Sequence, residues 1–264
     1  MKTPYDLYRE YRNLSVDLPD GTTVCGLDVH EYRNASLQGD LGVEAGLGQA
    51  FAELSASVRK HGKRSKHGEY LIILEESERD AGPLFPKIAR TRLWPDLQRP
   101  FVGKGSPEEI RQALRLAVHF ELVEPYQFTL QDYCDRYIGL DCSGFAGNFY
   151  GGAWNGKNAA GFLAGGIQVR RLEDIRPGHA ILWTNGKHIA LIDEVSGDGT
   201  SQALACMVAE STGDCMVAGG PADGLNYTTY FLEPGENGAF KIYRHLARAK
   251  TGFYSPHIKV MQIT

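Results

Sequence analysis

Apolar and polar residues alternate with two different periods along this chain. In the first half, apolar residues recur at helical spacing. Leu47, Phe51, Leu54 and Val58 lie three or four positions apart, which predicts an amphipathic helix over residues 45–60. In the second half, short apolar runs are separated by turn residues, which is typical of strands.

Two more helices are predicted before the midpoint. Ser106 is followed by a proline and, three positions later, by Glu109, a pattern that predicts an N-terminal capping box and a helix from residue 106. A further helix is expected from about Thr129 to Arg136. Residues 70–75 are predicted to form a short buried strand. The rest of the first hundred residues is expected to be irregular.

The second half is predicted to consist mainly of antiparallel strands. The predicted strands are residues 180–184, 188–195, 203–210, 227–231, 239–243 and 258–263. Helices followed by a run of strands indicate the α+β class. We therefore expect an amino-terminal extension of unknown role at residues 1–105 and a functional domain at residues 106–264.

Composition and charge restrict the kind of partner. With 264 residues, 42% of them hydrophobic and 23% charged, the chain is long enough to bury a core. The net charge is -4, and the single strongly basic run, residues 59–67, has no interleaved aromatic residues. We interpret this run as a solvated helix end and loop, so nucleic acid is not expected as a partner. No stretch approaches the roughly 18 to 20 apolar residues of a membrane span.

The five cysteines suggest a reactive thiol. Their odd number and the absence of a CxxC pair argue against a disulfide framework or a zinc site, and neither a metal nor an organic cofactor is expected. Cys25, Cys134, Cys206 and Cys215 are interpreted as small buried apolar side chains.

Cys142 lies in the strongest chemical motif of the sequence. Asp141 can cap the helix that follows, which places Cys142 in its first turn. There the unpaired N–H groups and the helix dipole favour a thiolate and can stabilise an oxyanion. Cys142 is therefore the predicted nucleophile, since the hydroxyl of Ser143 is less nucleophilic. Asp141 and Ser143 are expected at the substrate or oxyanion site.

A cysteine nucleophile needs a base, and two histidines flank one predicted hairpin. His188 begins the return strand after the Asn-Gly turn and is the predicted base. His179 is the alternative base or a substrate contact. Glu210, at the end of the next strand, is predicted to orient the imidazole, with Thr212 as an alternative.

These pieces, in this order, resemble the NlpC/P60 and CHAP families of papain-like cell-wall hydrolases. The resemblance covers roughly residues 129–235. It rests on Asp-Cys-Ser-Gly-Phe at 141–145, Arg-Pro-Gly at 176–178, and His-Ile-Ala-Leu-Ile at 188–192. Where these families usually have Pro-Gly-Asp before the strand, this chain has Pro-Gly-His.

The resemblance implies a papain-like fold in which the cysteine-bearing helix packs on a small antiparallel sheet. It also implies cleavage of an amide bond in peptidoglycan peptides, or between sugar and peptide. Cys142 would be the nucleophile, His188 the base and then the acid, and Glu210 the third residue. These families often hold a tyrosine near the oxyanion site, for which Tyr133 and Tyr137 are both candidates.

The expected partners follow from this resemblance. They are peptidoglycan or a peptide-like substrate and an immunity or inhibitor protein, with neither nucleic acid nor a membrane span. The first fourteen residues lack the apolar run of a signal peptide. We therefore expect synthesis in the cytoplasm and delivery to the cell envelope by a phage or a secretion system.

Three other classes of function remain open at this point. One is a cysteine acyltransferase or deamidase on the same scaffold, which would transfer the acyl group to an acceptor other than water or act on a side chain. Another is a catalytically silent binding module. The third is a structural protein in which the cysteine motif is a coincidence, which would be indicated by a His188 distant from Cys142.

Overall fold

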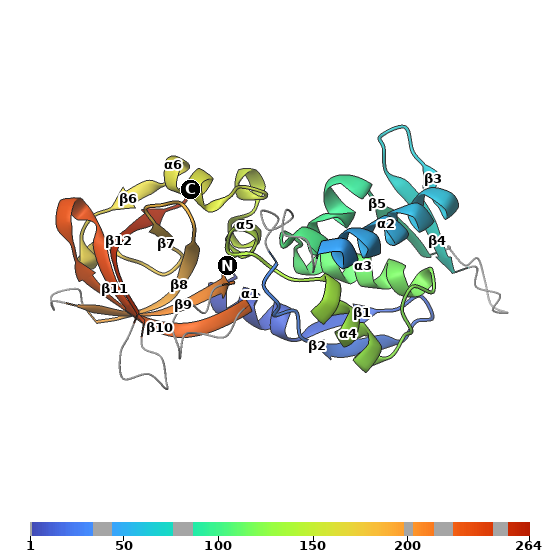
Figure 1. The fold of residues 1–264 in the computed structure, drawn as a ribbon, viewed down its shortest axis with the longest axis horizontal. Coiled ribbons are helices and arrows are strands. Elements are labelled where there is room, and N and C mark those ends of the chain that lie inside the picture. The colour runs from blue at the N-terminus through green and yellow to red at the C-terminus, as the bar shows by residue number, and fades with distance from the viewer. Residues whose placement is uncertain (1, 34–43, 76–86, 198–202, 214–223, 245–252) are drawn as a thin grey trace. The chain divides into compact units, whose positions relative to one another are not determined.

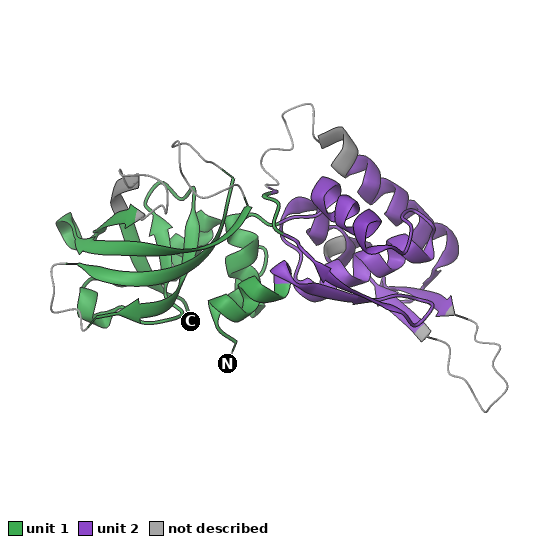
Figure 2. Cartoon of the chain, turned by 90° about the horizontal axis from the view of Figure 1, so that it is seen from below, with its two compact units in different colours: residues 1–10, 30–32, 140–264 green, residues 11–29, 33–139 purple. Residues whose placement is uncertain are grey.

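The chain folds into two compact units, each discontinuous in sequence. The computed structural model describes residues 2–33, 44–75, 87–197, 203–213, 224–244 and 253–264 (Figure 1). Unit 1 contains residues 1–10, 30–32 and 140–264, and unit 2 contains residues 11–29 and 33–139 (Figure 2). The division therefore differs from the single boundary after residue 105 that we expected from the sequence.

Unit 1 is built on a closed barrel of six antiparallel strands (Figure 1). The strands are β7 (Ala180–Trp183), β8 (Ile189–Ser196), β9 (Leu204–Thr212), β10 (Gly224–Pro234), β11 (Phe240–Arg244) and β12 (Phe253–Gln262). They follow one another around the barrel in sequence order, and β12 pairs with both β11 and β7, so the sheet closes on itself. A short strand, β6 (Ile167–Val169), pairs with β12.

The predicted papain-like α+β fold, with the cysteine helix packed on a small antiparallel sheet, is therefore wrong. The positions of the strands were predicted well, because alternation of apolar residues is a local property of each strand. Strands of an open sheet and of a barrel show the same alternation. Closure depends instead on the pairing of β12 with β7, two strands far apart in the sequence.

Among the described residues, the buried cluster inside the barrel is apolar, and Glu210 stands near the end of its β9 row. In β9, Leu204, Cys206 and Val208 belong to a buried cluster that also contains Tyr230 from β10. Side chains two positions apart in a strand share a face, so Glu210 continues the inward row of β9. Glu210 is 0% exposed. The barrel thus places a carboxylate next to its hydrophobic core.

Three helices belong wholly or mainly to unit 1. They are α1 (Pro4–Arg12), α5 (Cys142–Tyr150) and α6 (Ala159–Gly165), with short helical turns at η4 (Gly152–Trp154), η5 (Leu172–Asp174) and η6 (Glu236–Gly238). Helix α5 packs against β8 and β9, and α6 contacts β7 (Figure 1). The N-terminal part of α1 is tied to the barrel by the N–H of Tyr5, which donates to Oδ1 of Asp193 at 2.9 Å.

Residues 30–32 join unit 1 through close backbone contacts. The N–H of Leu225 donates to the carbonyl oxygen of His30 at 2.8 Å. Gly224 has a positive φ of 100°, and a Cβ built there would lie 1.8 Å from that same oxygen. Only glycine allows the two backbones to approach this closely.

Unit 2 combines helices with two small antiparallel sheets. Its strands are β1 (Leu14–Asp17), β2 (Thr23–Leu27), β3 (Lys63–Arg64), β4 (Tyr70–Glu75) and β5 (Lys87–Thr91). Its helices are α2 (Glu44–His61), α3 (Pro107–His119) and α4 (Gln127–Tyr137), with the turns η2 (Leu93–Leu97) and η3 (Arg99–Val102). The helices predicted at residues 45–60, from 106 and over 129–136 are confirmed. The expectation of an otherwise irregular first hundred residues is wrong. Within the described ranges, no helix is long and apolar enough to cross a membrane.

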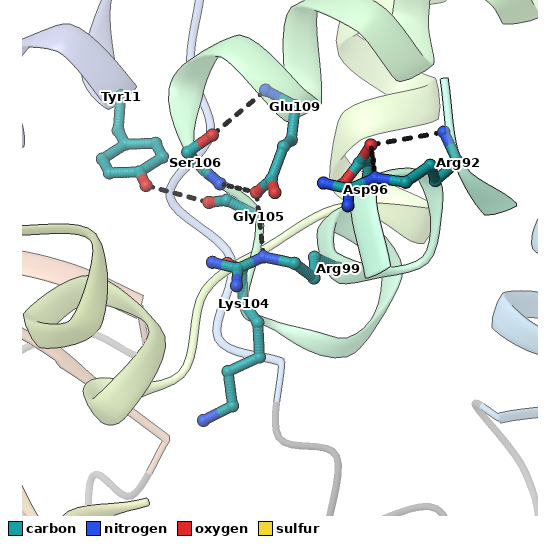
Figure 3. A network of polar contacts seen from close by, with 8 residues as sticks. All are labelled: Tyr11, Arg92, Asp96, Arg99, Lys104, Gly105, Ser106 and Glu109. Atoms are coloured by element: carbon teal, nitrogen blue, oxygen red, sulfur yellow. Dashed lines mark hydrogen bonds and ion pairs between the residues drawn. The ribbon is translucent and has the colours of Figure 1, made fainter. Parts of the chain in front are cut away.

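The capping box predicted for α3 is present. Oγ of Ser106 accepts from the N–H of Glu109 at 3.2 Å, and Oε2 of Glu109 accepts from the N–H of Ser106 at 2.7 Å (Figure 3). Nε of Arg99 donates to the same carboxylate oxygen at 3.0 Å. The hydroxyl of Tyr11 donates to the carbonyl of Gly105 at 2.9 Å. The start of α3 is thus fixed by its own cap and by contacts to other parts of unit 2.

Candidate functional site

Cys142 is the first residue of α5, as the sequence predicted. Asp141 precedes the helix in an extended conformation, with φ −92° and ψ 169°, and its carboxylate accepts from the N–H of Gly144. The hydroxyl of Ser143 donates to the same carboxylate at 3.1 Å. Asp141 and Ser143 are both buried. They therefore build the N-terminal cap that holds the sulfur of Cys142 at the positive end of the helix.

The residue before this cap is anchored to the barrel. The N–H of Leu140 donates to the carbonyl of Glu31 at 2.9 Å, and the carbonyl of Leu140 accepts from Oγ of Ser211 at 2.7 Å. Ser211 lies on β9, next to Glu210, and is fully buried. It was not predicted, although a serine in a buried stretch of strand indicates a hydrogen-bond partner. Ser211 fixes the start of α5 over the strand that carries Glu210.

The imidazole of His188 contacts both Cys142 and Glu210. Nε2 of His188 lies 2.6 Å from Oε2 of Glu210. The side chain of Cys142 is near enough to the ring to be among the groups that raise the pKa of His188. Because Glu210 engages Nε2, Nδ1 is the ring nitrogen available to the sulfur. The side chain of His188 is 15% exposed and that of Glu210 is 0% exposed. The structure therefore brings together the predicted nucleophile, base and orienting residue.

Opposing effects set the pKa of His188. Burial lowers this pKa, because the imidazolium loses hydration. The hydrogen bonds and charges of Cys142 and Glu210 raise it by more, and the result is a pKa of about 9, above the ordinary value of 6.5. His188 is therefore protonated at neutral pH.

Two aromatic residues complete the surroundings of His188 and Glu210. The hydroxyl of Tyr230 donates to Oε1 of Glu210 at 2.6 Å. The ring of Trp183 packs edge to face on His188, with ring centroids 4.7 Å apart. Sequence analysis assigned neither residue to the site. The position of Trp183 across the hairpin from His188 was a usable signal, whereas no local pattern connects Tyr230 to Glu210.

The alternative base, His179, lies at the other end of the same hairpin. Its carbonyl accepts from the N–H of Ile192, whereas the carbonyl of His188 accepts from the N–H of Trp183. Ile192 is separated from His188 by about 13 Å of extended strand. Nδ1 of His179 accepts from the N–H of Arg176 at 3.2 Å. The structure does not bring His179 to Cys142. Likewise Glu210, rather than Thr212, makes the hydrogen bond to His188.

Tyr133 and Tyr137, the two candidates for the oxyanion site, belong to α4 of unit 2. Their rings contact each other edge to face, with centroids 4.9 Å apart. Burial, together with the neighbouring Tyr137, raises the pKa of Tyr133. An oxyanion role for either tyrosine stays a prediction.

The other cysteines differ from Cys142 in their surroundings. Cys134 and Cys206 are buried as predicted, and burial raises the pKa of both thiols, that of Cys206 to about 12. Cys25 is exposed, so the prediction of burial is wrong for this residue. Cys215 lies outside the described residues. Neither buried thiol has a hydrogen-bonded imidazole among the causes that act on its pKa.

Unit 2 has a pocket of its own, with a volume of about 640 Å³. Lys63 and Glu121, of opposite charge, both line it, together with His61, His119 and Phe120. Burial and the nearby His61 lower the pKa of His119. The mixed charges indicate no particular ligand. Among the residues that the structure describes, no group of three or more His, Cys, Asp or Glu side chains is arranged to hold a metal ion.

Comparisons with known proteins leave the chemistry to be inferred from these residues. No protein-family model, curated protein or solved structure matches the chain.

Proposed function

We propose that this chain is a cysteine hydrolase that cleaves an amide bond by acyl transfer, and that its substrate is a peptide of peptidoglycan. The observation that supports the chemistry is the row of Cys142, His188 and Glu210, in which His188 hydrogen bonds Glu210 and lies beside Cys142. The substrate class is supported by the sequence resemblance to the NlpC/P60 and CHAP families.

In the first step, the thiolate of Cys142 attacks the carbonyl carbon of the scissile amide. A carbon–sulfur bond forms, and the π electrons of the carbonyl move to its oxygen. The backbone N–H of Cys142, at the first helical position of α5, has no acceptor within the helix and can donate to this oxyanion. The positive end of the helix dipole favours the same charge.

In the second step, the tetrahedral intermediate collapses and the carbon–nitrogen bond breaks. The imidazolium of His188 gives its proton from Nδ1 to the leaving nitrogen, so an amine departs and a thioester remains on Cys142. His188 is then neutral. The contact between its Nε2 and the carboxylate of Glu210 keeps the ring in place for the next step.

Hydrolysis of the thioester regenerates the site. Neutral His188 accepts a proton from a water molecule as the water oxygen attacks the thioester carbon. The carbon–sulfur bond then breaks, a carboxylic acid is released, and Cys142 and His188 return to the thiolate and imidazolium forms. An acceptor other than water at this step would give acyl transfer instead of hydrolysis.

The first test is the pH dependence of alkylation of Cys142 by iodoacetamide, followed site by site with mass spectrometry. Exposed Cys25 serves as an internal reference in the same sample. We expect Cys142 to be labelled rapidly well below about pH 8, the region where an ordinary thiol is still protonated, and we expect His188→Ala to abolish this low-pH labelling. Labelling of Cys142 that ignores His188 and follows the profile of Cys25 would contradict the proposal.

The second test addresses the substrate. Purified peptidoglycan is incubated with wild type and with Cys142→Ala, and the released fragments and new amino groups are identified by mass spectrometry. We expect release with the wild type only. A reactive Cys142 without release of any peptidoglycan fragment would contradict the substrate class but leave the thiol chemistry intact. A product carrying the acyl group on a non-water acceptor would favour an acyltransferase.

A further inference from the structure

Strand β10 carries two tyrosines that each donate to a carboxylate. The hydroxyl of Tyr230 donates to Oε1 of Glu210 at 2.6 Å, and the hydroxyl of Tyr227 donates to Oδ2 of Asp193 at 2.7 Å. The two tyrosines are three positions apart and so point to opposite faces of the strand. Tyr230 belongs to the buried cluster inside the barrel, and Tyr227 contacts Tyr5 of α1.

The burial of Glu210 makes its hydrogen bonds costly to lose. A carboxylate removed from water is strongly destabilised unless donors satisfy its oxygens. One oxygen of Glu210 faces Nε2 of His188, and the other accepts from Tyr230. Val208, the preceding inward residue of β9, and Ile192 of β8 are apolar members of the barrel core. Tyr230 therefore supplies a donor where the neighbouring core is hydrophobic.

The two hydrogen bonds of Glu210 also fix the orientation of its carboxylate. With Oε1 held by the phenol of Tyr230, rotation about the last side-chain bond is restricted, and Oε2 stays directed at His188. Tyr230 itself is 0% exposed and cannot move without disturbing the core. A fixed, buried phenol is thus a rigid support for the residue that orients the base.

We infer that Tyr230 is a positioning residue of this site: its hydroxyl holds Glu210 against His188, and His188 in turn keeps Cys142 reactive at neutral pH. This inference rests on the proposed function. It adds a fourth member, from strand β10, to the row of Cys142, His188 and Glu210.

The titratable groups around the row are compatible with this role. Cys142 from α5 and Glu210 from β9 are the groups that raise the pKa of His188. Cys206 lies opposite Tyr230 in the β9–β10 pairing and remains a neutral thiol, because burial raises its pKa to about 12. The carboxylate of Asp141 is engaged by its own helix N-terminus. Loss of the Tyr230 hydroxyl therefore acts on the thiol through Glu210.

The test compares Tyr230→Phe with Tyr227→Phe in the full chain. Both substitutions remove one hydroxyl that donates to a carboxylate from the same strand, so they are chemically matched. For Tyr230→Phe, we expect the rate of Cys142 alkylation at about pH 6.5 to fall about tenfold, with the midpoint of the profile moving to higher pH, as for the loss of one hydrogen bond to a charged group. For Tyr227→Phe, we expect the wild-type profile.

A double-mutant cycle with Glu210→Gln separates positioning from general loosening of the barrel. If Tyr230 acts through Glu210, Tyr230→Phe has no further effect on the alkylation profile once Glu210 is changed. Equal effects in both backgrounds would overturn the inference, as would an unchanged profile in Tyr230→Phe beside a reactive wild type. A wild type whose Cys142 behaves like Cys25 would overturn the proposed function and this inference together.

Discussion

Two histidines lie at opposite ends of the β7–β8 hairpin, and their surroundings move their pKa values in opposite directions. Burial lowers the pKa of His188, but Cys142 and Glu210 raise it to about 9. Burial also lowers the pKa of His179, and the charge of Arg176 lowers it further. Both histidines lie at hairpin ends, and His188 was predicted as the base because it begins the return strand after the turn. The charge of the nearest partner decides which histidine is protonated at neutral pH.

The largest effect should come from removing His188, with removal of His179 as the comparison. For the proposed cleavage of peptidoglycan, we expect His188→Ala to lower the rate by about 10²- to 10⁴-fold, the range that general acid–base catalysis contributes. His179→Ala should change cleavage less than about twofold, within the effect of a small loss of packing. The measurement is the initial rate of fragment release at neutral pH. A larger loss in His179→Ala than in His188→Ala would reverse the assignment of the base.

The partners of the two histidines can be exchanged for neutral residues. Glu210→Gln should lower the pKa of His188, because a charged acceptor is lost, and should slow alkylation of Cys142 by about 10- to 100-fold, as expected for an interaction of 1.4 to 3 kcal/mol. Arg176→Ala should raise the pKa of His179 and leave Cys142 unaffected. Both shifts can be followed by NMR titration of the imidazole protons. An unchanged His188 titration in Glu210→Gln would refute the role of Glu210.

The two histidines should also contribute to stability in different pH windows. The folded-state pKa of His188 lies above 6.5, so its contribution is complete below about pH 6.5 and is lost as the pH rises through about 9. The folded-state pKa of His179 lies below its ordinary value. As the pH falls below about 6.5, the unfolded chain therefore binds a proton at His179 more readily than the folded chain, and folding stability is lost. Urea unfolding at several pH values should show that His188→Ala reduces the alkaline decline and His179→Ala the acid decline. If stability depended on pH in the same way in both variants, the opposite pKa shifts of the two histidines would be contradicted.

A smaller effect than that of Glu210→Gln should come from Trp183, which packs on His188. An edge-to-face aromatic contact contributes about 0.5–1.5 kcal/mol beyond burial. Trp183→Leu should therefore slow alkylation of Cys142 by a few-fold, through a less well-held imidazole. Trp183→Phe should retain most of the rate. A Trp183→Leu variant as fast as the wild type would show that Glu210 alone orients the ring.

Local signals in the sequence located the residues of the candidate site but not the residues that hydrogen bond to them. Asp141 next to Cys142 revealed a helix N-terminus, because N-capping depends on residues within one turn. The hairpin around the Asn-Gly turn located His188 for the same reason. Tyr230 was missed because its contact to Glu210 joins two strands across 20 positions of sequence. Ser211 was missed because its partner, the carbonyl of Leu140, belongs to the backbone of a distant segment.

The fold was predicted strand by strand but not as a whole. Alternation of apolar residues marked the strands of the barrel, while its closure through β12 depends on which strands pair. The assignment of residues 30–32 to unit 1 follows from backbone hydrogen bonds, such as that from Leu225 to His30, which leave no periodic pattern in the sequence. Exposed Cys25 shows the same limit, since an isolated cysteine carries no information about which face of a strand is covered.

The closing strand of the barrel, β12, has a consequence for the order of events during synthesis. A ribosome makes Cys142, His188 and Glu210 well before residues 253–262, so a growing chain holds the whole row while the wall of the barrel is still open. Glu210 therefore acquires its buried surroundings only when the barrel closes, so the timing of the proposed chemistry depends on long-range strand pairing.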